Sequence, residues 1–246
     1  MADWVLILGG TSAIARATAQ ALAKRRYNLI LAGRDSDELE RIASDIAIRH
    51  EVSTRCQKLD IHELSGHRHF AQVLLGPEER LAGVVCAIGY LGDQEHAFTD
   101  ADEAERIIAT NYTGPVILIN EVAALLSKQQ QGFIIGIGSV AGDRGRQSNF
   151  IYGSAKGGFN LYLQGLRNRL FRDNVQVLTV KPGFVDTAMT FGMDGMFLVA
   201  QPEDIGDGII RAMEKKKDTI YLPFFWRYIM LIIRSIPEQL FKRLSL

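Results

Sequence analysis

Three polar residues between positions 139 and 156 have the types and the spacing for proton transfer to or from a carbonyl or alcohol oxygen. Tyr152 and Lys156 are four residues apart, so a helix would place them on one face. A lysine ammonium beside a phenol favours the phenolate, so we expect Lys156 to lower the pKa of Tyr152 from its usual value of about 10. An acid/base group nearer neutrality suits this proton transfer. Ser139 would hold the same oxygen by a hydrogen bond.

The same Tyr–Lys spacing also occurs on ordinary surface helices, where it carries no function. The residues before it argue for a site. Ser139 directly follows the apolar run at 133–138, which has the composition of a buried parallel strand. Open α/β sheets bind their ligands beyond the carboxyl ends of such strands. Ser139, Tyr152 and Lys156 are therefore candidate catalytic residues.

A glycine-containing loop follows the first apolar run of the chain, residues 5–8. The loop reads Gly9-Gly10-Thr11-Ser12, and a helical pattern follows over residues 13–25. A strand, a glycine loop and a helix N-terminus together bind a pyrophosphate, because backbone N–H groups and the helix dipole point at the anion. We therefore expect a dinucleotide at this place. Its predicted contacts in this segment are Gly10, Thr11, Ser12, Ala13 and Ile14.

The end of the second predicted strand, residues 28–32, indicates which dinucleotide is bound. An acidic residue just past this strand would suit a free ribose 2′-hydroxyl, whereas an arginine suits a 2′-phosphate. Gly33 leaves the acidic position empty, and Arg34 follows it. The sequence thus favours NADP(H) over NAD(H). The alternative is an Arg34 side chain that points to solvent.

Three further strand ends would complete the cofactor site. The third predicted strand, residues 52–59, leads to Asp60, a candidate contact to the adenine amino group. The fourth, residues 82–87, is followed by a glycine that would let the backbone pass close to a ribose. The strand at 175–180 is followed by a Pro-Gly pair that ends it sharply. The cofactor contacts expected at these ends are Asp60, Ile61, Ala87, Ile88, Gly89, Pro182 and Gly183.

Seven strand candidates alternate with helical segments along the chain. This alternation predicts an α/β protein with a three-layer doubly wound (Rossmann) fold and a seven-stranded parallel sheet. No internal repeat, low-complexity tract or linker interrupts the pattern, so we expect one domain over residues 1–246. Residues 101–128 are predicted as one long helix with Asn111 in its middle, although asparagine is a poor helix former.

The charge balance and the cysteine and histidine content exclude several classes of protein. Lysine plus arginine and aspartate plus glutamate each number 28, so the net charge is zero, which gives no support for nucleic-acid binding. The two cysteines lie in apolar stretches and are expected to be free thiols in a reducing compartment. The five histidines form no metal-ligand spacing, so no metal site is predicted. The first apolar run is too short for a signal peptide, and we expect a cytoplasmic protein.

In its order and spacing, this set of motifs resembles the short-chain dehydrogenase/reductase (SDR) family over nearly the whole chain. The resemblance rests on the glycine loop, on Asn111 within NYTGP, on Ser139 within GSVAG, on the YGSAK segment, and on Pro182-Gly183 followed by Thr187. Each motif is common by itself, but the complete set is specific.

The resemblance implies a role for each matching residue. It implies that Tyr152 is the general acid/base and that Lys156 also holds the nicotinamide ribose, so that both count as cofactor contacts as well. It implies that Ser139 orients the substrate carbonyl and that Asn111 anchors a proton-relay water. The two remaining residues that it implies, both at the nicotinamide carboxamide, are Val185 and Thr187.

The chain also departs from the family pattern. The usual loop is Thr-Gly-x-x-x-Gly-x-Gly, whereas this loop is one residue shorter and has Ala13 and Ala15 where glycines are expected. Their methyl groups would narrow the approach of the cofactor and the packing of helix on strand. Residues 86–89 read Cys-Ala-Ile-Gly in place of the usual Asn-Ala-Gly. The short loop, the GDRGRQSNF stretch and the C-terminal ending are similar to the branch of the family that contains decaprenylphosphoryl-2-keto-ribose reductase.

The C-terminal segment, residues 221–246, is predicted to be an apolar helical extension. Residues 224–233 are apolar on nearly every side of a helix. Such a helix packs in the core, over the active site as a lid, against a subunit or on a lipid surface. It is too short to span a bilayer, which takes about 20 apolar residues. On a membrane, its basic residues would meet lipid phosphates; they are Arg227, Arg234, Lys242 and Arg243.

We expect an NADP(H)-dependent oxidoreductase that reduces a ketone, or oxidises a secondary alcohol, by hydride transfer. The C-terminal helix favours a bulky or lipid-linked substrate. Two alternatives stay open. One is a non-catalytic dinucleotide-binding sensor or scaffold, suggested by the altered glycine loop. The other is a 3-oxoacyl thioester reductase, which shares the fold and the acid/base set. We also expect a homo-oligomer, a dimer or a tetramer. Peripheral contact with the inner membrane surface is one of the alternatives for the C-terminal helix.

Overall fold

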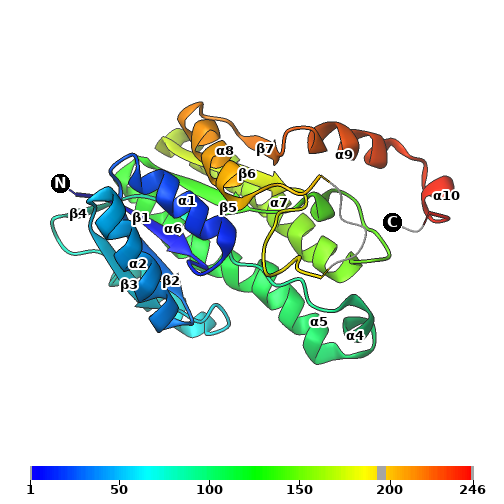
Figure 1. The fold of residues 1–246 in the computed structure, drawn as a ribbon, viewed down its shortest axis with the longest axis horizontal. Helices are drawn as coiled ribbons and strands as arrows, with labels where there is room; N and C mark the ends of the chain where they lie inside the picture. The colour runs from blue at the N-terminus through cyan, green and yellow to red at the C-terminus, as the bar shows by residue number, and fades with distance from the viewer. Residues whose placement is uncertain (1, 193–197, 245–246) are drawn as a thin grey trace.

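One parallel sheet lies at the centre of the molecule in this computed structural model, which describes residues 2–192 and 198–244 (Figure 1). Its strands, among the residues described, are β1 (Ala2–Leu8), β2 (Asn28–Gly33), β3 (Thr54–Lys58), β4 (Glu79–Cys86), β5 (Gly132–Ile137), β6 (Val175–Pro182) and β7 (Thr219–Leu222). They lie in the order β3-β2-β1-β4-β5-β6-β7, and every neighbouring pair is parallel. The predicted seven-stranded parallel sheet is therefore confirmed.

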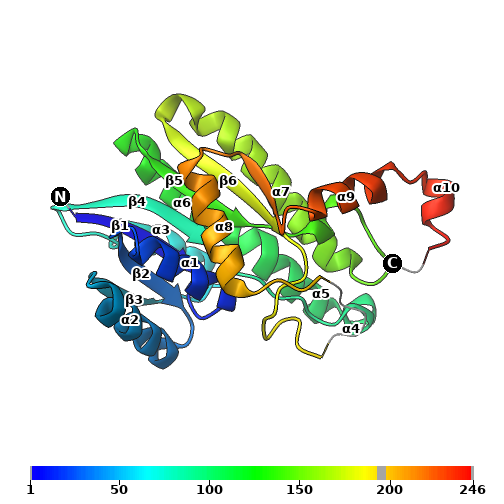
Figure 2. The same cartoon turned by 45° about the horizontal axis from the view of Figure 1, so that its top comes forward.

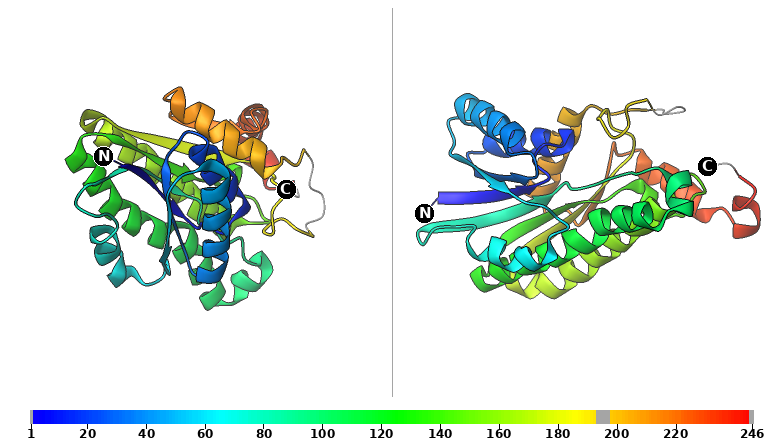
Figure 3. Two further views of the ribbon diagram at one scale, coloured as in Figure 1. Left: turned by 60° about the vertical axis from the view of Figure 1, so that its left-hand side comes forward. Right: turned by 90° about the horizontal axis from the view of Figure 1, so that it is seen from below.

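Helices cover both faces of the sheet. The α-helices are α1 (Ala13–Ala23), α2 (Ser36–His50), α3 (His67–Gln72), α4 (Gln94–Thr99), α5 (Ala101–Ile108), α6 (Gly114–Gln129), α7 (Phe150–Leu170), α8 (Pro202–Glu214), α9 (Trp226–Ser235) and α10 (Glu238–Phe241). The right-hand view of Figure 3 shows α1, α2 and α8 on one face and α3, α6 and α7 on the other. This arrangement is the three-layer doubly wound architecture that the alternation of strands and helices predicts.

Alternate side chains of β1 fill the two buried layers of the molecule. Val5 and Ile7 belong to the apolar cluster under α1, α2 and α8, whereas Leu6 and Leu8 belong to the cluster under α6 and α7. The period of two follows from the pleat of a strand, and burial on both faces explains why the run is apolar throughout. The first strand is thereby fixed in the core, and its end carries the glycine loop.

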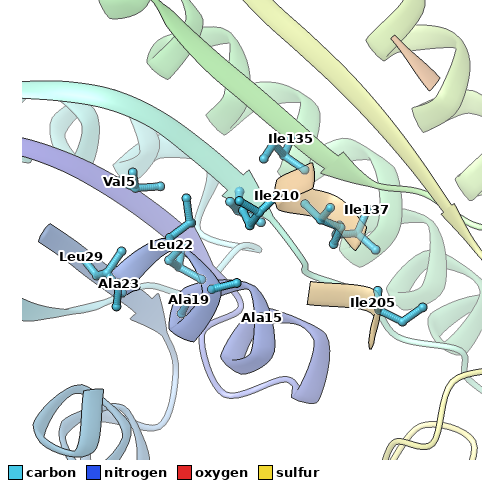
Figure 4. Close-up of a cluster of buried hydrophobic side chains, with 14 of the residues drawn as sticks. Val5, Ala15, Ala19, Leu22, Ala23, Leu29, Ile135, Ile137, Ile205 and Ile210 are labelled. Atoms are coloured by element: carbon cyan, nitrogen blue, oxygen red, sulfur yellow. The ribbon is translucent and has the colours of Figure 1, made fainter. Parts of the chain in front are cut away.

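The helices α1 and α8 pack closely because both present small residues to each other. Gly206 of α8 lies against α1, and an added Cβ would stand 2.6 Å from the backbone carbonyl carbon of Ala17. Figure 4 shows Ala15, Ala19 and Ile205 in the apolar cluster between these helices and the sheet. The close packing holds the N-terminus of α1 beside the carboxyl end of β1.

A π-helical turn, Ala109–Thr113, interrupts the long helix predicted over residues 101–128. The helix α5 ends before this turn and α6 begins after it, so the predicted helical stretch is present but is not α-helical in its middle. Asn111 lies inside the turn and is fully buried. π-helical turns are rare and occur mostly at functional sites.

The C-terminal segment forms two helices, α9 and α10, which lie beyond the carboxyl edge of the sheet (Figure 2). The inner face of α9 buries Trp226 and Met230, which pack against Val140 near the end of β5. Its outer face leaves apolar side chains exposed. None of the helices in the described part of the chain is long and apolar enough to cross a membrane.

Candidate active site

A cleft of about 1200 Å³ opens at the carboxyl edge of the sheet. The loops after β1, β4, β5 and β6 form its walls, and the start of α7 closes one side. The strand order reverses between β1 and β4, which is where a doubly wound sheet binds its ligand. Of the residues predicted from the sequence, the cleft is lined by Thr11, Ser12, Ala13, Ile14, Ala87, Ile88, Gly89, Ser139, Tyr152, Lys156, Pro182, Gly183, Val185 and Thr187.

Tyr152 and Lys156 project into the cleft from the first turns of α7. Both side chains are buried, with 9% and 3% of their surface exposed. The ammonium of Lys156 donates hydrogen bonds to the backbone carbonyl oxygens of Ile88, at 3.2 Å, and Ile137, at 3.1 Å. These carbonyls lie just past β4 and at the end of β5, so Lys156 ties α7 to the two strand ends that form the floor of the cleft.

Tyr152 does not have the lowered pKa that the sequence predicts. Burial raises the pKa of its phenol to about 12, while a hydrogen bond with Ser139 and the charge of Arg146 act more weakly in the opposite direction. Lys156 is not among the groups that set this pKa, and its ammonium contacts two backbone carbonyls instead. At neutral pH Tyr152 is therefore a protonated acid, the form that donates a proton to a carbonyl oxygen.

Lys156 is itself strongly affected by its surroundings. Burial lowers the pKa of its ammonium from 10.5 to about 8. The two backbone carbonyls that it contacts carry only partial charges, so they compensate for the lost hydration less than a carboxylate would. Lys156 is thus a cation at neutral pH that loses its proton far more readily than a surface lysine.

Ser139 stands at the end of β5, as the sequence predicts. It caps the short 3₁₀ turn η3 (Val140–Asp143), and its hydroxyl accepts a hydrogen bond of 3.0 Å from the backbone N–H of Ala141. This bond fixes the oxygen and leaves the hydroxyl proton for another acceptor. Ser139 and Tyr152 therefore face the same part of the cleft from β5 and α7.

Asn111 lies behind the cleft rather than on its wall. Its amide donates to the backbone carbonyls of Tyr90, at 2.6 Å, and Ile107, at 2.8 Å, and accepts from the N–H of Tyr90 at 3.2 Å. An added Cβ on Gly89 would stand 3.4 Å from both Asn111 Oδ1 and Lys156 Nζ. The π-helical turn thus places Asn111 next to Lys156, where it holds the chain after β4 in position.

The start of α1 fits a dinucleotide. Gly9 has φ +76°, and an added Cβ would stand 3.1 Å from the Ala87 carbonyl, so this loop needs glycine to pass over the end of β4. Ser12 caps the helix by accepting a 3.2 Å hydrogen bond from the Ala15 N–H. The first turn of α1 contains no acidic residue, so its positive dipole end stays available to a pyrophosphate.

The two alanines that replace family glycines occupy different environments. Ala15 is fully buried between α1 and the sheet, so its methyl group belongs to the core. Ala13 lines the cleft. Only one of the two substitutions therefore lies where a cofactor would approach.

Five predicted residues lie outside the cleft wall. Gly10 is packed under Leu39, where an added Cβ would stand 2.9 Å from a side-chain carbon. Asp60 accepts a hydrogen bond from the N–H of His62 at 3.0 Å. Arg34 is exposed just past β2, and Asp35 after it is the N-cap of α2. The other two are the buried residues Ile61 and Asn111.

Several cleft residues were missed in the sequence. Arg16, one turn into α1, lines the cleft beside the predicted dinucleotide segment. Arg146 lines it beside Tyr152, and no motif signals its role, although it lies in the GDRGRQSNF stretch. Trp226 reaches the cleft from α9, and an added Cβ on Gly183 would overlap its indole ring. Only a tertiary contact brings Trp226 there.

The comparisons with known proteins agree with this geometry. The family model described as short chain dehydrogenase matches residues 3–194. An uncharacterized oxidoreductase of Mycobacterium tuberculosis is 32% identical over 240 residues, which cover 98% of this chain and 96% of that protein.

Two solved structures share the fold. A short-chain dehydrogenase from Sphingobium yanoikuyae in complex with NADPH has a TM-score of 0.83 at 22% identity, covering 96% of this chain and 97% of that one. A bulky-bulky ketone specific alcohol dehydrogenase from Comamonas testosteroni has a TM-score of 0.80 at 21% identity, covering 96% of this chain and 95% of that one. Because the family model and the mycobacterial relative both match, the chain belongs to the short-chain dehydrogenase family of NAD(P)-dependent oxidoreductases.

Proposed function

We propose that this protein is an NADP(H)-dependent reductase that converts a ketone to a secondary alcohol, with Tyr152 as the general acid/base. The observation that carries the proposal is the position of Tyr152 in the cleft, protonated at neutral pH and beside Ser139 and Lys156. A chain that only bound a dinucleotide would have no use for a buried phenol there. The scaffold alternative is therefore the weaker one.

Each residue of the site has a separate role in the proposed reaction. The bound nicotinamide dinucleotide supplies the hydride. Tyr152 donates a proton to the carbonyl oxygen, and Ser139 donates a hydrogen bond to the same oxygen. Lys156 places its positive charge near the developing alkoxide, and Asn111 fixes the segment after β4 against which Lys156 is held. In the reverse direction Tyr152 would take the proton from the alcohol.

A matched pair of serine variants tests this assignment. Ser139→Ala removes the hydrogen bond to the carbonyl oxygen, and we expect kcat for hydrophobic ketones with NADPH to fall roughly 100-fold. Ser154→Ala is the control, because Ser154 lies on α7 but is exposed, and its hydroxyl donates a local hydrogen bond to the Ile151 carbonyl at 2.7 Å. Equal activities for the two variants would refute the role of Ser139.

The charges past β2 support a preference for NADP(H). Arg34 is exposed there. Arg16 lines the cleft from the start of α1, and its guanidinium lies 3.8 Å from the carboxylate of Glu38. The two carboxylates are already engaged, because Asp35 accepts from the N–H of Glu38 at 3.0 Å and Glu38 pairs with Arg41 at 2.6 Å. Arg34 forms no ion pair among the described residues and is thus left to meet a 2′-phosphate, while Arg16 adds a second positive charge although it is also paired with Glu38.

Arg34→Gln tests this preference directly. Loss of one charge-assisted contact should lower the ratio of kcat/KM for NADPH to that for NADH by roughly tenfold or more. Arg49→Gln is the control, since Arg49 lies at the far end of α2 and pairs with Asp45. An unchanged ratio in Arg34→Gln would show that this side chain points to solvent.

The cleft walls support a bulky or lipid-linked substrate. Phe184 and Trp226 line the cleft, and their rings meet edge to face with centroids 5.5 Å apart. The mouth also carries Met189 and Phe191, which are 41% and 89% exposed. The neighbour from Comamonas testosteroni is named for bulky ketones, which points the same way. A screen of hydrophobic ketones against small ones tests this part of the proposal.

The outer face of α9 supports peripheral contact with an anionic membrane. Three side chains of this face, Tyr228, Leu231 and Ile232, and that of Phe224 just before the helix are all at least 60% exposed. Its flanks are basic, because residues 224–244 hold four lysines and arginines and a single acid, Glu238. An apolar face with a basic border suits an anionic lipid surface, and a second copy with the same charges would be repelled.

Vesicle sedimentation tests this contact. Wild type should sediment with vesicles that contain phosphatidylglycerol and less with phosphatidylcholine alone, and Leu231→Glu/Ile232→Glu should abolish binding. Ile48→Glu is the control, because Ile48 is 81% exposed on the distant helix α2. Equal sedimentation of all variants would remove the membrane proposal.

Homo-oligomerisation stays a prediction, which light scattering can test.

A further inference from the structure

The loop between η3 and α7 carries a guanidinium into the cleft. Arg146 lines the cleft together with Ser148, Asn149 and Tyr152. This part of the cleft lies between β5 and α7, whereas the dinucleotide segment lies after β1. Arg146 therefore faces the place where the carbonyl of a substrate would meet Tyr152.

The charge of Arg146 is not balanced within the described residues. In the segments 2–192 and 198–244, no carboxylate pairs with it, and its Nε is buried without a hydrogen-bond partner. The carboxylate of Asp143 acts on it from a distance, but it is occupied by Lys181 and by the Tyr221 hydroxyl, each at 2.6 Å. Burial lowers the pKa of Arg146 accordingly. A partly buried cation of this kind is stabilised when a ligand supplies the counter-charge.

The backbone that carries Arg146 is held on both sides of this residue. Arg144 donates to the backbone carbonyls of Ile233, at 3.0 Å, and Ile236, at 2.6 Å, near the end of α9. On the other side, the N–H of Asn149 donates to the carbonyl of Arg146 at 3.2 Å. Because the backbone is already fixed, only the side chain of Arg146 loses conformational entropy when it binds a ligand.

We propose that Arg146 binds an oxyanion group of the ketone substrate, either a phosphate ester or a carboxylate. The planar guanidinium matches both groups by paired hydrogen bonds. The Oδ1 of Asn149, which is buried and has no hydrogen-bond partner among the described residues, is an acceptor and would suit a hydroxyl group of the substrate rather than its anionic group. The substrate class is thus a ketone with an anionic group close to the carbonyl. This inference rests on the proposed reduction at Tyr152.

A binding experiment tests the site without turnover. The full chain, saturated with NADPH, is titrated calorimetrically with methyl phosphate and, separately, with acetate. Wild type should bind at least one probe, and Arg146→Gln should bind it roughly 10- to 100-fold more weakly, with Arg146→Lys between them. Arg172→Gln, which alters an exposed arginine in a separate shallow pocket, should bind like wild type. If wild type binds neither probe, or if Arg146→Gln binds like wild type, the proposal is overturned.

Kinetics on paired substrates separate this proposal from the proposed reduction. Levulinate and its methyl ester differ in one negative charge, and dihydroxyacetone phosphate and dihydroxyacetone differ in about two at neutral pH. We expect Arg146→Gln to lower the ratio of kcat/KM for the anionic member to that for the neutral one by roughly tenfold or more, mainly through KM. An unchanged ratio overturns the anion site only. Probe binding at Arg146 with no reduction of any ketone counts against the proposed function only.

Discussion

A buried ion pair between Asp143 and Lys181 ties the turn after Ser139 to the end of β6. The carboxylate and the ammonium are 2.6 Å apart, and their side chains are only 4% and 9% exposed. The hydroxyl of Tyr221 on β7 donates to the second carboxylate oxygen at 2.6 Å. These contacts hold η3 in place, and with it the hydroxyl of Ser139. We predict that breaking the pair destabilises the whole protein.

The magnitude follows from what each variant leaves behind. Asp143→Asn keeps the shape of the side chain but leaves the ammonium of Lys181 buried without a counter-charge, which costs about 3–5 kcal/mol. Lys181→Met leaves the carboxylate in the same position and should cost a similar amount. The double variant Asp143→Asn/Lys181→Met buries no charge. It should therefore lose at least about 2 kcal/mol less than the sum of the single variants.

Urea unfolding of the full chain at neutral pH measures these differences. The matched control is the pair of Arg49 with Asp45, which has the same 2.6 Å separation but lies on the surface, 65% and 44% exposed. Asp45→Asn should cost no more than about 0.5 kcal/mol. If Asp143→Asn costs as little as Asp45→Asn, or if the two single variants add without coupling, burial does not control the energy of this pair.

Three further predictions concern the site. The pKa of Lys156 falls on folding, so the unfolded chain holds more protons than the folded one between pH 8 and 10.5. As the pH rises through this window, the free energy of unfolding in urea should therefore increase by about 2–3 kcal/mol more for wild type than for Lys156→Met. A difference between the two proteins that stays constant with pH would contradict this prediction. Gly183→Ala places a methyl group against the indole of Trp226 and should lower the free energy of unfolding by about 1–3 kcal/mol, measured by thermal unfolding. Gly165→Ala on α7 is the control, because its methyl group meets open space and should not lower the stability. Because the pKa of Tyr152 is raised, the fraction of phenolate that can accept a proton from an alcohol grows about tenfold per pH unit between pH 8 and 10. The rate of alcohol oxidation should rise in the same proportion, whereas the rate of ketone reduction should not. Parallel pH profiles for the two directions would contradict this prediction.

The sheet and the cleft could be predicted because their signals are local. An apolar run such as residues 133–138 indicates a buried strand, and the polar residue after it must then lie at the sheet edge. The spacing of Tyr152 and Lys156 sets their common face as soon as α7 is a helix. Short-range patterns of this kind do not depend on knowing the partners of each element.

The electrostatics of the site could not be predicted, because they depend on burial and on distant segments. Tyr152 has a raised pKa since α7 packs on the sheet, and nothing in the YGSAK segment reveals that desolvation. Lys156 is turned to backbone carbonyls that lie after β4 and at the end of β5. The role of a neighbouring charge therefore appears only when the tertiary contacts are known.

The C-terminal segment shows the same limit in its packing. Its composition is apolar on all sides, which left core, lid, subunit and membrane contacts open. The structure buries Trp226 and Met230 against the end of β5 and leaves Leu231 and Ile232 exposed. Which half of such a helix is buried depends on the surface that receives it.

The most direct test of the account is single-turnover reduction by Tyr152→Phe. With saturating NADPH and a hydrophobic ketone, loss of the phenolic proton should slow the chemical step by about 100-fold or more. NADPH affinity should stay close to that of wild type. Tyr162→Phe, which removes a hydroxyl on the same helix that bonds to Asn120, should react like wild type. Reduction at an undiminished rate by Tyr152→Phe would contradict the central claim that this buried phenol delivers the proton.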